Sequence, residues 1–323
     1  MKKHRVALIC GVNGQDGAYL SKFLLSKGYE VWGTSRDAQG NPFINLRRLG
    51  IYKQIKTLSL VPEDFRSVFV ALKKSNPDEV YYLAGQSSVG LSFEQPAETI
   101  QSITIGTLNI LESCRMVDHP IKLYHAGSSE CFGDTKGIPA NETTPFHPQS
   151  PYAVAKASAF WLVDNYRESY NLFACTGILF NHESPLRPAH FVTQKIITTA
   201  YNIAQGTANK LRLGRLDIAR DWGWAPEYVE AMWRLLQQSE PMDIVIATGV
   251  TSTLEFFVKT TFEAFQLDWG KYVYQDKDLF RPTDLSYSQA DPTKMHTILK
   301  WSPKFRVPEI VKGMISGMTF DNK

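Results

Sequence analysis

Residues 6–28 read VALICGVNGQDGAYLSKFLLSKG, and this stretch decides the fold. A short apolar run, typical of a buried strand, leads into glycines at positions 11, 14 and 17 and then into an amphipathic stretch that ends at Gly28. In a strand–turn–helix unit, the first glycine permits a tight turn, the second lets the backbone approach a pyrophosphate, and the third lets the helix pack on the strand. The helix start favours negative charge. The segment therefore predicts a nucleotide-binding loop, and the plainer alternative is a strand–turn–helix that holds no ligand.

The same rhythm continues through the first 180 residues. Apolar, β-rich runs alternate with amphipathic stretches, and they read RVALICG, YEVWGTS, IKTLSLV, DEVYYLAG, IKLYHAGSS and LFACTGILF. Strands that are apolar on both faces, separated by helices, are typical of a parallel sheet covered on both sides. We expect helices at about 15–27, 64–75, 98–117 and 152–170. The predicted fold class is α/β, a Rossmann-type doubly wound parallel sheet.

After Asn181 the rhythm loosens, and prolines at 185 and 188 interrupt the chain. Helical patterns return near 190–205, 226–238 and 307–318. DIVIATG reads as one more buried strand, and the tail is expected to form proline-rich turns before the last helix. We expect residues 1–181 to form the cofactor-binding domain and about 216–245 to return to it. Residues 182–323 are expected to form mainly a smaller, interleaved substrate-binding lobe.

Composition excludes several classes of function. The chain has 323 residues, 43% of them hydrophobic, and a net charge of +3 with both signs mixed along it, so neither a nucleic-acid arm nor a polybasic membrane patch is predicted. No apolar segment approaches membrane-spanning length, and the apolar run before Gly11 is too short for a secretion signal. The four cysteines lack the spacing of a metal or redox site. We expect buried thiols, no metal and a cytoplasmic location.

The end of the second predicted strand, YEVWGTS, bears on the choice of cofactor. Arg36 and Asp37 follow it directly. An acid here would accept hydrogen bonds from a ribose 2′-hydroxyl, whereas an arginine would pair with a 2′-phosphate. Both residues are present, so the pattern leaves the choice open. We favour NADP because Arg36 comes first.

Tyr152 and Lys156 are four residues apart on a predicted helix, so they share one face. The same spacing recurs by chance at Tyr52 and Lys56, and only the context of the first pair is distinctive. A lysine beside a tyrosine stabilises the phenolate, so we expect the phenol pKa to fall from about 10 toward neutrality, which would make a usable base. The alternative is an ordinary amphipathic helix start.

The predicted strand IKLYHAGSS ends in Ser128 and Ser129 and is followed at once by Glu130. An unpartnered carboxylate is costly where a hydrophobic strand ends. The acid therefore either takes part in catalysis or caps a backbone amide.

The strings GVNGQDG, SSE and YAVAK resemble the extended short-chain dehydrogenases that act on sugar nucleotides. The longer strings GQSSVGLSFEQP, NYRESYNLFACTGILFNHESP, FVTQK, RDWGWAPEYVEAMW and VIATG resemble the GDP-mannose 4,6-dehydratase family, and the similarity covers nearly the whole chain. This resemblance implies conversion of GDP-mannose to GDP-4-keto-6-deoxy-mannose with bound NADP. It also implies that Glu130 removes the proton of sugar carbon 5. The implied catalytic residues are Ser128, Glu130, Tyr152 and Lys156.

The resemblance also implies two sets of binding residues. Cofactor contacts are expected at Gly11, Asn13, Gly14, Gln15, Asp16, Gly17, Arg36, Leu83, Ala84, Gln86, Ser87, Tyr152, Lys156, His182 and Arg187. Substrate contacts are expected at Ser88, Asn181, Glu183, Lys195, Arg220 and Arg281. His182 could instead be a buried histidine with its own partners, and each arginine could make a surface ion pair.

Some positions depart from the family pattern. Ser128 stands where threonine is usual, and Glu98 where a cofactor-contacting tyrosine is usual. Residues 37–50 lack the serine-rich loop that clasps a neighbouring subunit in relatives. We therefore expect at least a homo-dimer, with a homo-tetramer in doubt. The alternative functions are a GDP-4-keto-6-deoxy-mannose reductase, a dehydratase of a related sugar such as GDP-manno-heptose, and an NADP-binding scaffold without catalysis.

Overall fold

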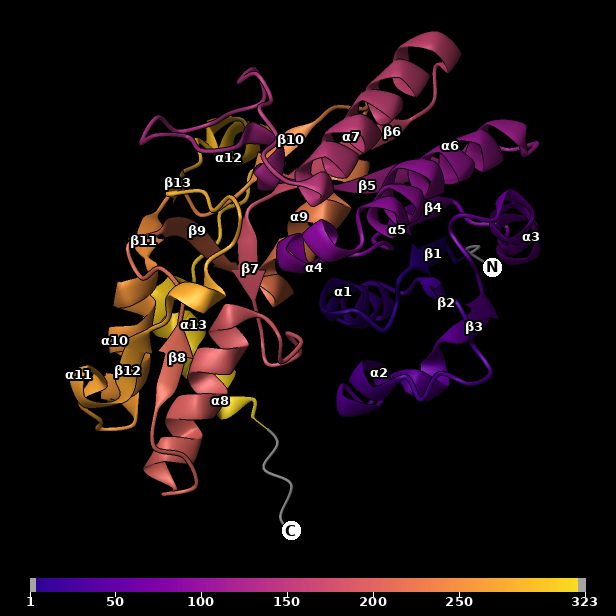
Figure 1. Cartoon of the computed structure of the whole chain (residues 1–323). Helices are drawn as coiled ribbons and strands as arrows, with labels where there is room; N and C mark the ends of the chain where they lie inside the picture. The colour runs from indigo at the N-terminus through magenta and orange to yellow at the C-terminus, as the bar shows by residue number, and fades with distance from the viewer. Residues whose placement is uncertain (1–3, 319–323) are drawn as a thin grey trace.

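The computed structural model describes residues 4–318 and has a seven-stranded parallel sheet at its centre (Figure 1). The predicted Rossmann-type, doubly wound α/β class is confirmed. Strand order reverses between β1 and β4, since the chain first builds outward through β2 and β3 and then crosses to the other side. In spatial order the strands are β10 (Ile244–Ile246), β6 (Ala174–Leu179), β5 (Lys122–Ser128), β4 (Glu79–Tyr82), β1 (Val6–Cys10), β2 (Glu30–Ser35) and β3 (Lys56–Ser59).

Helices cover both faces of this sheet because its strands are apolar on both sides. In β1, Ala7 and Ile9 enter one core cluster, and Leu8 and Cys10 enter the other. The first face is covered by α1 (Gln15–Ser26), α9 (Ala225–Leu236) and α12 (Thr293–Leu299). The second face is covered by α3 (Phe65–Ser75), α6 (Gly106–Met116) and α7 (Pro151–Tyr170).

The helix predicted at 98–117 is present. It runs without a break from α5 (Pro96–Ile100) through a π-helical turn, Gln101–Ile105, into α6. A separate short helix that was not predicted, α4 (Val89–Glu94), precedes it and is capped by Ser88. The chance pair Tyr52 and Lys56 is not on a helix, because η1 (Tyr52–Gln54) is a short 3₁₀ turn and Lys56 begins β3.

The smaller lobe begins where β6 ends. Phe180 still bonds to the large sheet through Ile246, and the next residues form β7 (Asn181–Glu183) of a second sheet. Around β7 lie β9 (Ala219–Trp224), β11 (Thr251–Thr253) and β13 (Tyr287–Ser288), and a two-stranded sheet pairs β8 (Leu211–Leu213) with β12 (Val273–Gln275). The lobe's helices are α8 (Val192–Ala204), α10 (Leu254–Ala264), α11 (Trp269–Tyr272) and α13 (Val307–Ser316). Shorter connections are α2 (Ile44–Arg48), η3 (Ser129–Phe132) and η4 (Lys277–Leu279).

Helix α10 corrects the prediction of proline-rich turns in the tail. The Thr253 side chain accepts a hydrogen bond from the Phe256 amide and so caps the helix. The helix then buries Leu254, Phe257 and Phe262 in the core of the small lobe. Within 216–245, β10 belongs to the large sheet and α9 packs against that sheet, whereas β9 belongs to the small sheet. The domain boundary near 181 remains a prediction.

The four cysteines are buried and unpaired, as predicted. Across residues 4–318, no helix combines the length and the apolar character needed to cross a membrane.

Candidate active site

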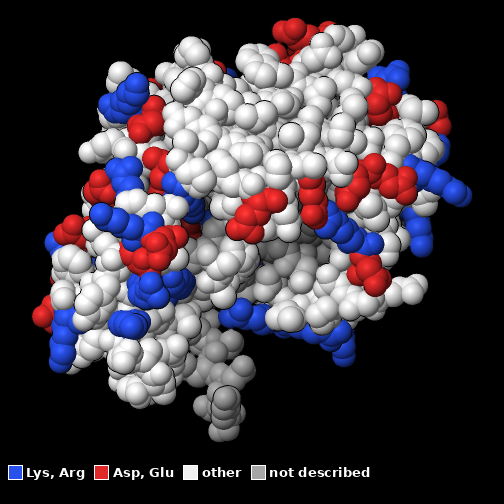
Figure 2. Space-filling model, in the orientation of Figure 1, with Lys and Arg blue, Asp and Glu red and all other residues white. Residues whose placement is uncertain are grey.

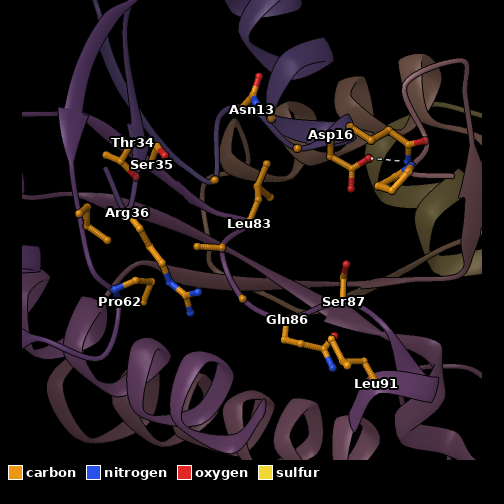
Figure 3. Close-up of a pocket in the computed structure, with 18 of the residues that line it drawn as sticks. Asn13, Asp16, Thr34, Ser35, Arg36, Pro62, Leu83, Gln86, Ser87 and Leu91 are labelled. Atoms are coloured by element: carbon orange, nitrogen blue, oxygen red, sulfur yellow. Dashed lines mark hydrogen bonds between the residues drawn. The ribbon is translucent and has the colours of Figure 1, made fainter. Parts of the chain in front are cut away.

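A cleft of about 530 Å³ opens at the carboxyl edge of the large sheet, where the strand order reverses. Its walls include the glycine loop after β1 and the segment Leu83–Ser87 after β4. Open α/β sheets bind ligands at such a switch point. Figure 2 shows this face hollowed between the α4–α5 region and the α2–α8 region, and Figure 3 shows the lining side chains.

The three glycines answer steric demands of this cleft. Gly11 has φ +87°, and a Cβ on it would lie 3.2 Å from the Ala84 backbone. A Cβ on Gly17 would lie 2.4 Å from the Gly11 carbonyl oxygen, so only glycine lets α1 approach β1 so closely. Helix α1 begins without a side-chain cap. Its first amide groups, which have no partner within a helix, are therefore free to bind an anion, and the cradle fits a pyrophosphate.

Most of the predicted cofactor residues line this cleft. They are Gly11, Asn13, Gly14, Gln15, Asp16, Gly17, Arg36, Leu83, Ala84, Gln86, Ser87 and Arg187. Further lining residues lie outside the predicted set, namely Thr34, Ser35, Leu60, Pro62, Gly85, Leu91, Gln95, Glu98, Pro188 and Phe191. Of these, the sequence analysis singled out Glu98, at a position where relatives contact the cofactor. Thr34 and Ser35 end β2 and Leu60 directly follows β3, and a strand end is a signal available from sequence. The contribution of α4, α5 and the segment before α8 has no such local signal.

At the end of β2, Arg36 and Asp37 behave differently. Arg36 lines the cleft (Figure 3). The Asp37 carboxylate turns into its own loop and accepts hydrogen bonds from the amides of Gln39 and Gly40 at 2.9 and 3.0 Å. The acid therefore caps a turn, and the arginine is the charged side chain that this strand end presents to the cleft.

His182 is fully partnered and is not among the residues that line the cleft. Its Nδ1 lies 2.7 Å from the Phe180 carbonyl oxygen and its Nε2 lies 2.9 Å from Asp16 Oδ2. Burial alone would lower the pKa of His182, but the Asp16 carboxylate raises it. Burial alone would raise the pKa of Asp16, and His182 outweighs burial and lowers it. These contacts match the alternative of a satisfied buried histidine, which here ties the glycine loop to β7.

The predicted catalytic residues come from three elements, β5, η3 and α7. Strand β5 ends in Ser128, whose hydroxyl accepts the Glu130 amide at 3.3 Å. Helix α7 starts at Pro151 and is capped by Ser150, which places Tyr152 in its first turn.

The pair on α7 reaches back to the end of β5. The Tyr152 hydroxyl hydrogen-bonds with Ser128. Lys156 Nζ lies 5.9 Å from the Tyr152 ring centroid and donates to the Ala126 carbonyl at 2.8 Å. The Ser128 hydroxyl, the Tyr152 phenol and the Lys156 ammonium group thus lie near the carboxyl end of β5, and Glu130 is close enough to act on the phenol electrostatically.

Burial controls the ionisation of the tyrosine–lysine pair. It raises the pKa of Tyr152, although the hydrogen bond with Ser128 opposes the shift. It lowers the pKa of Lys156 to about 8. The prediction that the phenol pKa falls toward neutrality is therefore wrong for the chain alone. Desolvation of the phenolate is the largest cause of the shift, and the Lys156 ammonium group donates to the Ala126 carbonyl.

Glu130 is half-buried, and the loss of hydration that comes with burial raises the pKa of its carboxyl. Arg220 and Arg281 oppose that shift. Among the hydrogen bonds of residues 4–318, none runs from a backbone amide to the Glu130 carboxylate, so the capping alternative does not apply: Ser128 is the cap at this turn. Glu130 is left as an acid of raised pKa beside the Tyr152–Ser128 pair.

The predicted substrate residues divide into two groups. Arg220 is buried near Glu130 and bonds to Asp284 at 3.3 Å, and the more exposed Arg281 lies 3.9 Å from the same aspartate. The other four predicted substrate residues hold protein contacts or lie in another element. Ser88 caps α4, Lys195 donates to the Arg212 carbonyl at 2.7 Å, Glu183 accepts the Thr193 hydroxyl at 2.6 Å, and Asn181 begins β7. Arg187 Nε is 3.3 Å from Glu183 but outside hydrogen-bond geometry.

A doubly wound sheet with a glycine cradle and a tyrosine–lysine pair beside it defines an enzyme of the short-chain dehydrogenase/reductase class. Comparison with known proteins narrows the class, since residues 8–314 match the family model described as GDP-mannose 4,6 dehydratase. The chain belongs to the GDP-mannose 4,6-dehydratase family.

Curated relatives and solved structures agree with this assignment. The chain is 44% identical to GDP-mannose 4,6 dehydratase 1 of Arabidopsis thaliana, with 98% of this chain and 90% of that protein covered. It is 42% identical to GDP-mannose 4,6-dehydratase of Vibrio cholerae, with 98% and 93% covered. Among solved structures, UDP-glucose 4-epimerase of Thermus thermophilus in complex with NAD aligns with a TM-score of 0.84 at 26% identity, covering 97% of this chain and 98% of that one.

Proposed function

We propose that this protein removes water from GDP-mannose and forms GDP-4-keto-6-deoxy-mannose, with NADP as a resident cofactor. The observation that carries the proposal is the position of Glu130. An acid of raised pKa lies near the Tyr152 phenol, next to Ser128, and Lys156 shares a helix with that tyrosine; these four residues lie outside the lining of the dinucleotide-type cleft. A simple alcohol oxidation needs the last three groups, whereas elimination of water needs an additional group that takes one proton and gives it back.

NADP is favoured over NAD by the side chain that the end of β2 presents. Arg36 lines the cleft, whereas the Asp37 carboxylate already accepts hydrogen bonds from the amides of its own turn. An arginine offers a planar fork of donors to a phosphate. When bound, NADP supplies a store for one hydride, so that the hydride lost by sugar carbon 4 can return at carbon 6 without net oxidation.

The side chains then divide the proton transfers. Tyr152, as phenolate, takes the proton of the sugar 4-hydroxyl, with Ser128 holding that oxygen and Lys156 stabilising the phenolate. A ketone at carbon 4 makes the proton on carbon 5 acidic. Glu130 removes that proton and, once protonated, passes it to the 6-hydroxyl, which leaves as water. A proton from solvent then restores the C–H bond at carbon 5, and Tyr152 releases the proton that it took from the 4-hydroxyl. The raised pKa of Glu130 suits the first of these transfers, because a carboxylate of higher pKa is a stronger base toward carbon 5. The protonated carboxyl is still far more acidic than an alcohol, so it can go on to protonate the leaving 6-hydroxyl.

Turnover of GDP-mannose in heavy water tests this function. We expect loss of one water by mass spectrometry, solvent deuterium at sugar carbon 5, and no net accumulation of reduced nicotinamide. A reductase would leave GDP-mannose untouched and consume NADPH only with the keto sugar. Preferred turnover of GDP-manno-heptose in a panel of GDP-, UDP- and dTDP-sugars would instead point to the related substrate. Binding without turnover of any sugar would point to a scaffold.

We also propose that the subunits form a homo-dimer through α5, α6 and α7. Figure 2 shows few charged side chains over these helices. Large apolar side chains stay exposed there, namely Ile100, Ile105, Met116, Val154, Trp161 and Tyr170. Such a face fits a subunit interface. Trp161→Glu places a charge at its most exposed member, and light scattering should report a mass near that of a monomer; an unchanged dimer mass would count against this surface.

The location that we propose remains the cytoplasm. It is supported by four buried cysteines that stay unpaired.

A further inference from the structure

At the end of the cleft formed by β2, two carboxylates lie close to the positive charge of Arg36. Arg36 Nη2 lies 3.4 Å from Glu63 Oε1, and Arg36 Nη1 lies 4.0 Å from Glu98 Oε1. Glu98, on α5, itself lines the cleft, whereas Glu63 lies between β3 and α3 outside the lining. The positive charge that a 2′-phosphate would meet here is therefore shared with two carboxylates.

No second cation reinforces Arg36 at this end. The cations among the described lining residues are Arg36 and Arg187, and the acids are Asp16 and Glu98. Arg187 stacks on Phe191 and lies near Glu183, on the other lobe. Figure 3 shows Arg36 and Asp16 at opposite ends of the pocket. One arginine thus faces the 2′ position with an acid on each side of it.

The two pairs are loose, and this decides what the acids do. Neither contact is a short, two-pronged fork, and the three side chains remain partly exposed, so the pairs hold Arg36 weakly. Arg36 can turn toward an incoming phosphate at small cost. Glu98, which stays in the lining, then repels the same phosphate.

We propose that Glu98 is a cofactor-specificity residue: its carboxylate opposes a 2′-phosphate and makes this chain discriminate weakly between NADP and NAD. The inference rests on the proposed function, since it takes a nicotinamide dinucleotide as the ligand of this cleft. A carboxylate and a phosphate dianion about 5–7 Å apart at a partly exposed, salt-screened site repel each other by an amount equal to roughly three- to tenfold in affinity. NAD, which has a hydroxyl at this position, does not meet this repulsion.

Equilibrium exchange measures the preference without relying on turnover. The purified protein is incubated with equal, saturating concentrations of NADP+ and NAD+, desalted rapidly and denatured, and the released nucleotides are separated and quantified. Glu98→Gln should raise the bound NADP/NAD ratio about three- to tenfold over wild type, and high salt should shrink that gain. Glu263→Gln, at an exposed position of α10 in the smaller lobe, removes the same charge away from the cleft and should leave the ratio unchanged. Arg36→Met should lower the ratio.

The possible outcomes distinguish a failure of the Glu98 proposal from a failure of the proposed NADP-dependent function. An unchanged ratio in Glu98→Gln, with Arg36→Met still lowering it, overturns the role of Glu98 and leaves NADP binding intact. A lower ratio in Glu98→Gln shows that the carboxylate positions Arg36 instead of opposing the phosphate, and also overturns the proposal. Retention of neither nucleotide by wild type contradicts the proposed cofactor itself, and the role of Glu98 falls with it.

Discussion

Replacing Glu130 with glutamine isolates the step that separates dehydration from simple oxidation. The amide keeps the size of the side chain but cannot take the proton from carbon 5. The fold should tolerate the change, because Arg220 keeps its ion pair with Asp284 at 3.3 Å when the Glu130 charge is removed. Tyr152, Lys156 and Ser128 are untouched, so oxidation at carbon 4 should still occur.

The expected loss is large. General acid–base catalysis contributes about a hundred- to ten-thousandfold in rate, which corresponds to about 3–5 kcal/mol of barrier. Rapid mixing of Glu130→Gln with GDP-mannose should show reduced nicotinamide appearing up to one equivalent per site and then persisting. Mass spectrometry should show little loss of water, and deuterium from heavy water should not enter at carbon 5.

The pH profile gives an independent check. Glu130 acts first as a base and must be ionised in the free enzyme. Because burial raises its pKa, kcat/KM of wild type should fall on the acid side at a higher pH than an ordinary glutamate would give. Glu130→Gln should lack this acid limb. Wild-type turnover in Glu130→Gln, or a failure to form any reduced nicotinamide, would refute the assignment; Glu263→Gln serves as the neutralising control.

Three further changes test the rest of the site. Tyr152→Phe removes the base for the first step, so no reduced nicotinamide should form in the rapid-mixing assay, although cofactor should still be retained. Gly17→Ala places a Cβ 2.4 Å from the Gly11 carbonyl oxygen, so retained cofactor and the melting temperature should both fall; normal retention would disprove this close approach. Lys156 has a folded pKa of about 8 against 10.5 when unfolded, so the unfolded chain binds more protons between these values and wild-type stability should rise with pH there, by up to about 3 kcal/mol. Denaturation of wild type and Lys156→Met at several pH values should show this rise only in wild type.

The parallel sheet could be predicted because its signals are local. Strands that place Ala7 and Ile9 on one face and Leu8 and Cys10 on the other must be covered twice. The glycine positions follow from steric limits that hold in any strand–turn–helix unit of this kind. Helix α10 was missed although it also has a local pattern, since Thr253 caps it and apolar residues recur at 254, 257, 258 and 262. Its threonines and phenylalanines, which favour strands, hid that period.

The electrostatics of the site could not be predicted in the same way. Arg36, Glu63 and Glu98 are far apart in the sequence, and nothing near Arg36 indicates that two acids approach it. The partners of His182 are Asp16, in the first turn of α1, and the nearby Phe180 carbonyl. Spacing together with sequence context predicted Tyr152 and Lys156 on one helix face, but the direction of the Tyr152 pKa shift depends on how much protein surrounds the phenol.

Burial has the same effect on the ionisation of Tyr152, Lys156 and Glu130, because it favours the neutral form of each group. For Glu130 this is useful, since a carboxyl that protonates readily can carry a proton from carbon 5 to the leaving hydroxyl. For Tyr152 it is an obstacle, since catalysis needs the phenolate. Lys156 alone does not overcome it, because its ammonium donates to Ala126 and its own pKa is lowered. Positive charge near the phenol opposes this shift: Arg187 already lowers the pKa of Tyr152, and an oxidised nicotinamide ring would add to that effect. We therefore expect Tyr152 to act as a base more readily in the cofactor-bound enzyme, which would tie sugar deprotonation to the presence of a hydride acceptor.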